Sequence, residues 1–139
     1  MPLFSRLTAL VDRLSPPETV HAHCDLPCGI YDPAQARIEA DSVRAIQEKY
    51  QGSDDPVFKD RCILIKEERA DLVKHHLWVL WTDYFKPDHV QKYPNLHELF
   101  WSATKLAGDS KKTNDVATAQ KLLDSIGEID KIFWETKKG

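Results

Sequence analysis

Apolar side chains recur every three to four residues over most of this chain, and this spacing restricts the possible folds more than any other feature. The spacing is found near residues 34–50, 57–85, 95–108 and 113–133. It places apolar residues on one face of an α-helix. No segment alternates apolar and polar residues as a half-buried strand does, and no Asn-Gly hairpin signal occurs. The sequence therefore predicts an all-α fold, an antiparallel (up-down) four-helix bundle with short connections.

Capping and breaking residues mark the ends of these helices. We expect Asp32 to cap the first helix, with Pro33 at its first helical position and Gln35 reaching back toward the cap. Single residues mark the other boundaries: Pro87 as the stop of the second helix, Asn95 as the cap of the third, Gly108 as its end and Thr113 as the cap of the fourth.

Each helix has a predicted inward face. The residues expected in the core are Ile38, Ala45 and Ile46 in the first helix, Ile63, Ile65, Ala70, Leu72, Val73, Leu77, Leu80, Trp81 and Tyr84 in the second, Leu99, Phe100, Ala103 and Leu106 in the third, and Val116, Leu122, Leu123, Ile126, Ile129 and Phe133 in the fourth.

Length and charge exclude several classes of protein. A chain of 139 residues suits one domain with a single core. A net charge of −3 argues against nucleic acid as a partner, because phosphate binding needs a basic surface. No stretch approaches the roughly 20 apolar residues that span a membrane. Charges interrupt the amphipathic residues 3–14, unlike a secretory signal, so we expect a cytoplasmic protein.

A compact group of metal-ligand side chains lies just before the first helix. Residues 23–33 read His-Cys-Asp-Leu-Pro-Cys-Gly-Ile-Tyr-Asp-Pro. His23, Cys24 and Cys28 offer an imidazole and two thiols, which late first-row transition metals prefer as ligands. Three cysteines, an odd number, do not suit a disulfide framework. Taken alone, these residues fit a metal site and two incidental thiols about equally well.

The run of residues 23–33 closely resembles the nickel-binding hook of the nickel superoxide dismutases. The resemblance continues through residues 34–40 and, more loosely, along the helical remainder. Members of that family begin their mature chain at the histidine. The resemblance therefore implies a leader at residues 1–22 that a peptidase removes, and an enzyme at residues 23–139 with its hook at 23–31 and its bundle at 32–139. It also implies assembly into a homohexamer.

The resemblance implies one nickel ion per subunit, held by His23, Cys24 and Cys28. After cleavage, the α-amine of His23 and the backbone nitrogen of Cys24 would complete a plane of two nitrogens and two thiolates, with the imidazole axial. Such nitrogen-rich planes favour Ni(II) or Cu(II) over zinc. The donors alone do not distinguish nickel from copper, and the resemblance selects nickel. The implied activity is conversion of superoxide to O2 and H2O2 by Ni(II)/Ni(III) cycling.

Five positions beyond the ligands match the family's pattern. Glu39 and Arg69 resemble a pair that positions the His23 imidazole. Tyr31 resembles a residue that screens the open face of the metal, and Tyr84 a hydroxyl nearby. Lys86 resembles a residue that anchors the hook or attracts an anion. Without the resemblance, these would be ordinary solvated charges and half-buried aromatics.

Two other classes of function stay open on the residues alone. One is a helical nickel or copper carrier or sensor that uses the same ligands without turnover. The other is a thiol redox protein in which Cys24 and Cys28 form a disulfide.

Several further residues carry smaller expectations. Pro27 matches the hook proline of the family, for which a cis peptide bond is expected. Cys62 lies among apolar neighbours as an inert thiol. No metal role is expected for the remaining histidines: His21 in the leader, the adjacent His75 and His76, and His89 and His97 near helix ends. Trp78, Trp101 and Trp134 suit subunit contacts and a monomer core equally.

Overall fold

The computed structural model describes residues 29–138, and within them all regular structure is helical. The elements are α2 (Ala34–Gln51), α3 (Pro56–Val79), a π-helical turn η1 (Leu80–Tyr84), α4 (Pro87–Lys92), α5 (Leu96–Lys112) and α6 (Val116–Lys137). Between residues 29 and 138, no helix has the length and apolar character needed to cross a membrane.

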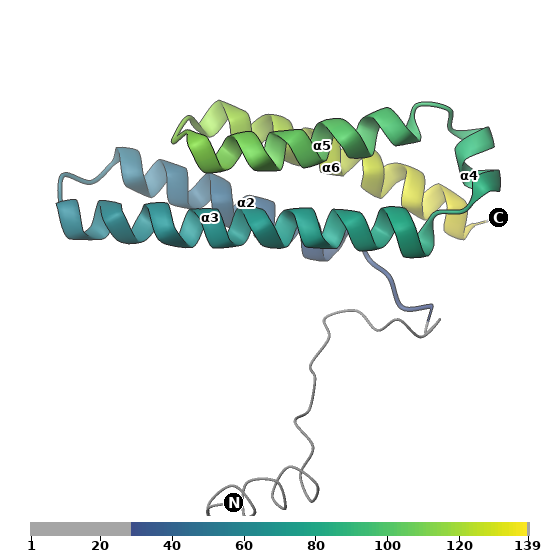
Figure 1. Ribbon diagram of the computed structural model, residues 1–139, viewed down its shortest axis with the longest axis horizontal. Helices are drawn as coiled ribbons and strands as arrows, with labels where there is room; N and C mark the ends of the chain where they lie inside the picture. The colour runs from purple at the N-terminus through teal and green to yellow at the C-terminus, as the bar shows by residue number, and fades with distance from the viewer. Residues whose placement is uncertain (1–28, 139) are drawn as a thin grey trace, which may run out of the picture.

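Four of these helices form an antiparallel bundle (Figure 1). Helix α3 packs against α2 and α5, and α6 packs against the same two helices. Short turns join α2 to α3 and α5 to α6 at one end, and the short helix α4 connects α3 to α5 at the other. This arrangement confirms the predicted four-helix bundle, whereas α4 was not predicted.

The core is made of small residues on α2 and larger ones on the other helices. Helix α2 buries Ala36, Ala40, Val43 and Gln47, a spacing of three to four residues. Helices α5 and α6 contribute Phe100 and Phe133, and Phe85 lies 5.4 Å from Phe100 between ring centroids. Small side chains on α2 allow its backbone to pack close to α3 and α6.

Three of the predicted core positions are wrong. Ile38, Ile63 and Ile65 are exposed, with Ile38 56% accessible. Ile38 lies two positions from both Ala36 and Ala40, which on a helix places it about 200° around the axis from them. Ile38 is the larger apolar residue, but alanines pack better where two backbones approach closely.

The helix boundaries follow the predictions only in part. Asp32 Oδ1 accepts a hydrogen bond from the Ala34 N–H (2.8 Å), but Pro33 occupies the N-cap and α2 begins at Ala34, one residue later than predicted. Asn95 makes no capping bond, and Asp115 rather than Thr113 caps α6 by accepting from the Ala117 N–H (3.0 Å). Pro87 begins α4.

Gly108 does not end α5, which continues to Lys112. A glycine inside a helix costs about 1 kcal/mol relative to alanine. Burial of Ala107 and Ser110 on either side of it offsets that cost, because ending the helix at residue 108 would expose both.

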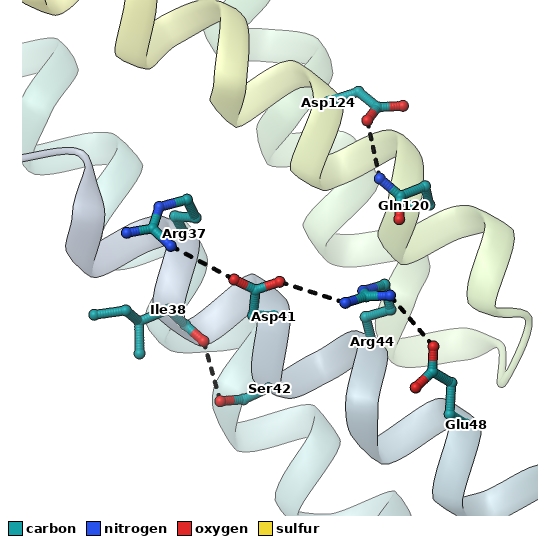
Figure 2. A network of polar contacts seen from close by, with 8 residues as sticks. All are labelled: Arg37, Ile38, Asp41, Ser42, Arg44, Glu48, Gln120 and Asp124. Atoms are coloured by element: carbon teal, nitrogen blue, oxygen red, sulfur yellow. Dashed lines mark hydrogen bonds and ion pairs between the residues drawn. The ribbon is translucent and has the colours of Figure 1, made fainter.

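The outward face of α2 carries a ladder of charges (Figure 2). Asp41 pairs with Arg37 (3.7 Å) and Arg44 (3.8 Å), and Arg44 pairs with Glu48 (3.3 Å). Ser42 Oγ donates to the Ile38 carbonyl (3.0 Å) on the same exposed face. Each pair one turn apart contributes about 0.2–0.5 kcal/mol to the helix.

A buried lysine fastens the turn between α5 and α6. Lys66 on α3 is 2% exposed, and its Nζ donates to the Thr113 carbonyl (2.7 Å) and to Asn114 Oδ1 (2.8 Å). Gln47 Nε2 donates to the same Thr113 carbonyl (3.2 Å). Burial lowers the pKa of Lys66 below its usual value, and the nearby Glu67 carboxylate opposes this. One ammonium thus joins α3 to the far turn of the bundle.

Candidate metal centre

The three predicted ligands, His23, Cys24 and Cys28, and the hook residue Pro27 lie outside the described residues. From Gly29 to Lys138, no three His, Cys, Asp or Glu side chains are grouped so that they could hold a metal ion. The fit to nickel therefore depends on the chemistry of the donors in the hook. Two thiolates and an imidazole suit nickel or copper, which bind sulfur and nitrogen ligands together.

The described part of the chain begins with a turn that only glycine adopts easily. Gly29, next to Cys28, has φ of 73°, in the left-handed region. A side chain there would meet no other atom within 4 Å, so the requirement for glycine comes from the backbone alone. The chain turns sharply at this point, between the cysteine and the first bundle helix.

A pocket of about 430 Å³ opens beside this turn. It contains three of the predicted site residues, Tyr31, Tyr84 and Lys86. Its full lining is Gly29, Tyr31, Asp83, Tyr84, Lys86, His89, Thr136 and Lys137. The pocket joins residues from the start of the described chain, the end of α3, the start of α4 and the end of α6.

The π-helical turn at the end of α3 positions Tyr84. The Phe85 N–H donates to the Leu80 carbonyl five residues earlier (3.1 Å). Such turns change the direction in which the following side chains point and are frequent at functional sites. Tyr84 lies against Phe133, 4.4 Å between ring centroids, and its ring is tilted 54° to that of Tyr31 at 5.6 Å.

The Tyr84 hydroxyl has a defined hydrogen-bond direction. It lies 2.7 Å from Thr136 Oγ1, and the Thr136 hydroxyl lies 2.6 Å from the Phe133 carbonyl oxygen. A carbonyl can only accept, so the Thr136 proton is directed at Phe133. Tyr84 must then donate to Thr136, and the phenolic oxygen keeps its lone pairs as acceptors.

Positive charge surrounds the two tyrosines. Lys137 Nζ lies 5.1 Å from the centre of the Tyr84 ring, and Lys86 also lines the pocket. His89 stacks on Tyr84 at 5.8 Å and accepts a hydrogen bond at Nδ1 from the Lys86 N–H (3.2 Å) at the start of α4. Asp83 is the acidic residue in the lining. Cationic groups thus outnumber acidic ones, which favours an anion.

Glu39 and Arg69 form an ion pair between α2 and α3. Arg69 Nη1 lies 3.2 Å from Glu39 Oε2 and 3.3 Å from Oε1, and the Glu39 side chain is only 16% exposed. Arg69 Nη2 also contacts the exposed Glu68 (3.5 Å). The structure brings the two predicted partners together, thirty positions apart in the sequence. Their action on His23 stays a prediction.

The chain matches known proteins over most of its length. The sequence profile of the nickel-containing superoxide dismutases covers residues 18–137. The chain belongs to this family. It is 61% identical to the superoxide dismutase [Ni] of Streptomyces coelicolor and 60% identical to that of Streptomyces seoulensis, in both cases over 93% of this chain and 99% of the relative.

Solved nickel superoxide dismutases have the same fold. A native structure at 62% identity superposes with a TM-score of 0.82, covering 84% of this chain and 100% of the other. A metal-free structure at 60% identity gives a TM-score of 0.79 over 80% of this chain. The described helices are therefore those of a nickel superoxide dismutase, an enzyme with a nickel cofactor that acts on superoxide.

Sequence reasoning missed part of the pocket of this nickel superoxide dismutase. Thr136 and Lys137 lie near the end of the chain, about fifty positions from Tyr84, and nothing in their spacing connects them to it. His89 had a weak signal, because it follows Pro87 at the third position of a short helix.

The buried position of Cys62 agrees with its prediction, whereas the absence of a metal role for the histidines stays a prediction. Cys62 is a free thiol, 6% exposed. His76 is buried whereas its neighbour His75 is exposed, so the two rings face different surroundings.

Proposed function

We propose that nickel is held by His23, Cys24 and Cys28 after cleavage before His23, and that superoxide reaches it through the pocket of Tyr31 and Tyr84. The observation that carries this proposal is the position of the pocket. It opens at Gly29, one residue after the last proposed ligand, and the family's activity requires an anion to enter there.

Four residues of the pocket lining have separate roles in this proposal. Lys86 and Lys137 attract the anionic substrate. Tyr31 and Tyr84 narrow the approach so that only a small molecule and ordered water reach the hook. The Tyr84 oxygen, with its hydrogen donated to Thr136, accepts a hydrogen bond from such a water. Bound nickel supplies the one-electron redox chemistry.

The ion pair of Glu39 and Arg69 is proposed to orient the His23 imidazole. Ring nitrogens that do not bind metal usually donate to a carboxylate or carbonyl, which fixes the orientation of the ring. Glu39 is mostly buried and is held by Arg69, so its carboxylate has little freedom to move. An oriented acceptor of this kind would keep the other ring nitrogen directed at the metal.

Removal of residues 1–22 is part of the proposal. The native solved chain is matched over its whole length but covers 84% of this chain, whereas the Streptomyces coelicolor sequence covers 93%. A mature form shorter than the encoded one would explain this difference. Cleavage by a peptidase would also free the α-amine of His23 as a nickel ligand.

The test compares residues 1–139 with residues 23–139, each reconstituted with Ni(II). Nickel content and superoxide dismutation are measured for both. We expect dismutation only in the trimmed form, with a Ni(III) signal split by an axial nitrogen. Equal activity in both forms would overturn the role of the α-amine. Nickel binding without turnover in either form would favour the carrier.

We also propose that the enzyme is a homohexamer in the cytoplasm, where thiols stay reduced. Trp134 on α6 is 45% exposed, and Leu64 on α3 is 70% exposed. Large apolar side chains at this exposure are typical of subunit contacts. Light scattering of the native enzyme should give six subunits, and a Leu64→Glu change should lower that number, whereas Lys121→Glu on α6 should not.

A further inference from the structure

A second pocket lies between α3 and α5, away from Tyr31 and Tyr84. Its volume is about 480 Å³, and it shares no lining residue with the pocket beside Gly29. Its lining on α5 runs from Trp101 to Lys112, toward the α5–α6 turn, whereas α4 lies at the other end of the bundle (Figure 1). The proposed dismutation does not use any residue of this pocket.

The lining of this pocket is strongly basic. Lys74, Lys105, Lys111 and Lys112 line it, with Asp109 as the acidic residue. Asp71 pairs with Lys111. Over residues 29–138, no carboxylate forms an ion pair with Lys74, Lys105 or Lys112. Three uncompensated ammonium groups therefore meet around one concave surface, in a chain whose net charge is −3.

Gly108 makes room for one of these ammonium groups. A β-carbon at residue 108 would lie 3.2 Å from Lys74 Nζ and 3.4 Å from its Cε. Lys74 therefore extends across α5 at the one position without a side chain. Glycine in the middle of a helix is unfavourable by about 0.5–1 kcal/mol relative to alanine. The space beside Lys74 therefore lowers the stability of α5. The half-buried ammonium of Lys74 fills that space without an acidic partner.

An aromatic pocket adjoins the basic one. Its volume is about 200 Å³, and the two share Trp101 and Thr104. The rest of its lining is Trp78, Trp81, His97 and Phe100. Lys105 Nζ lies 5.4 Å from the centre of the Trp101 ring, so the indole separates the cationic region from the aromatic one.

We propose that the basic pocket binds a small phosphorylated anion, with its phosphate on Lys74, Lys105 and Lys112. Multiply charged phosphate is the anion that several converging ammonium groups suit best. A superoxide ion carries one charge and needs no such cluster. The adjoining aromatic pocket takes a flat group attached to the phosphate, where the ligand has one.

Isothermal titration of the nickel-loaded enzyme with pyrophosphate tests the site. We expect one pyrophosphate per subunit, and an affinity that falls as potassium chloride is raised. Lys74→Met should weaken binding at least tenfold, and Lys121→Met on α6 should leave it unchanged. Failure of the wild-type enzyme to bind pyrophosphate, or equal binding by Lys74→Met, would overturn the proposal.

Gly108→Ala provides a variant that separates binding from folding. Alanine favours the helix, so the variant should be as stable as the wild type or more so. Its methyl group would lie 3.2 Å from Lys74 Nζ, so the flexible ammonium needs to shift by only a few tenths of an ångström, and pyrophosphate binding should weaken less than in Lys74→Met. The matched control is Gly127→Ala in α6, where a β-carbon meets no atom within 4 Å. Weaker binding by Gly108→Ala than by Lys74→Met would contradict the assignment of the phosphate to Lys74.

Two further titrations identify the kind of phosphate ligand. Inorganic phosphate and adenosine triphosphate are compared with pyrophosphate under the same conditions. A nucleotide that binds more tightly than pyrophosphate, with that gain lost in Trp101→Ala, assigns the aromatic pocket to the base. Equal affinities, unaffected by Trp101→Ala, assign the site to the phosphate group alone. Dismutation by the Lys74 variant should equal that of the wild type, which distinguishes this site from the metal centre.

Discussion

Tyr84 donates its hydroxyl hydrogen to Thr136, because the threonine's own hydrogen is committed to the Phe133 carbonyl at 2.6 Å. The end of α6 thereby determines how a side chain at the end of α3 presents its oxygen to the pocket. Tyr31 and Tyr84 line that pocket with their ring centroids 5.6 Å apart, so Thr136, which lies outside the hook, acts on the pocket beside it.

Replacing Thr136 by valine should therefore lower dismutation without unfolding the bundle. Valine has nearly the same shape but offers Tyr84 no acceptor, so the phenol loses its fixed direction. A hydrogen bond of this kind contributes about 1 kcal/mol. If its loss raises the activation free energy by the same amount, the dismutation rate falls roughly fivefold. The measurement is the dismutation rate of the nickel-loaded variant. Thr136→Ser keeps the hydroxyl and should keep the rate; a fully active valine variant would contradict the assigned direction.

Loss of the Glu39 carboxylate should weaken nickel binding. Glu39→Gln keeps the size of the side chain but removes the charge that Arg69 holds and that is proposed to orient His23. Partners of metal-binding histidines typically affect metal affinity by about 10–100-fold. The loss is measured as the nickel affinity of the trimmed chain, by competition with a chelator.

Glu68→Gln is the matched control for this change, since Glu68 contacts the same arginine but is 65% exposed. It should leave the nickel affinity close to that of the wild type. If Glu39→Gln binds nickel as tightly as Glu68→Gln does, the Glu39 carboxylate only pairs with Arg69 between α2 and α3 and does not orient His23.

Gly29→Ala should disturb the hook through its backbone. A residue with a β-carbon at φ of 73° loses about 1–2 kcal/mol. No neighbouring atom lies close enough to clash, so the whole effect comes from the dihedral angle. We expect nickel affinity of the trimmed chain to fall roughly fivefold or more.

Gly52→Ala offers the comparison, because Gly52 ends α2 at φ of −84°, which any residue adopts. A β-carbon there makes only ordinary contacts, the nearest at 3.5 Å. Nickel affinity should be unchanged in this variant. Equal effects of the two alanines would mean that the turn at Gly29 relaxes in the nickel-bound state.

The sequence predicted the bundle well and its details less well. The spacing of apolar residues reports the four helices because each must bury one face. It did not identify the face of α2, where alanines pack inward and Ile38 outward. Glu39, Arg69, Tyr31 and Tyr84 could be named only because the hook resembled a known family. Thr136 and Lys137 could not, since only the folded bundle brings the end of the chain to Tyr84.

The buried ammonium of Lys66 should make the stability of the bundle rise with pH. Its pKa is lowered by burial, whereas in the unfolded chain it returns to about 10.5. Between the lowered value and 10.5, the unfolded chain binds more protons than the folded one, so the free energy of unfolding increases as pH rises. Below the lowered value, both states are protonated and the slope from this residue vanishes. Urea unfolding of the metal-free protein at increasing pH measures this slope.

Lys66→Met should remove this part of the slope, because methionine does not titrate. It should also lower stability at neutral pH, since the Thr113 carbonyl and Asn114 lose the donor that holds the α5–α6 turn. Lys121→Met, at an exposed site on α6, controls for the loss of one charge and should keep the slope. An identical pH dependence in Lys66→Met and the wild type would show that the ammonium is not desolvated in the fold. The hydrogen bonds would then account for its whole contribution to stability.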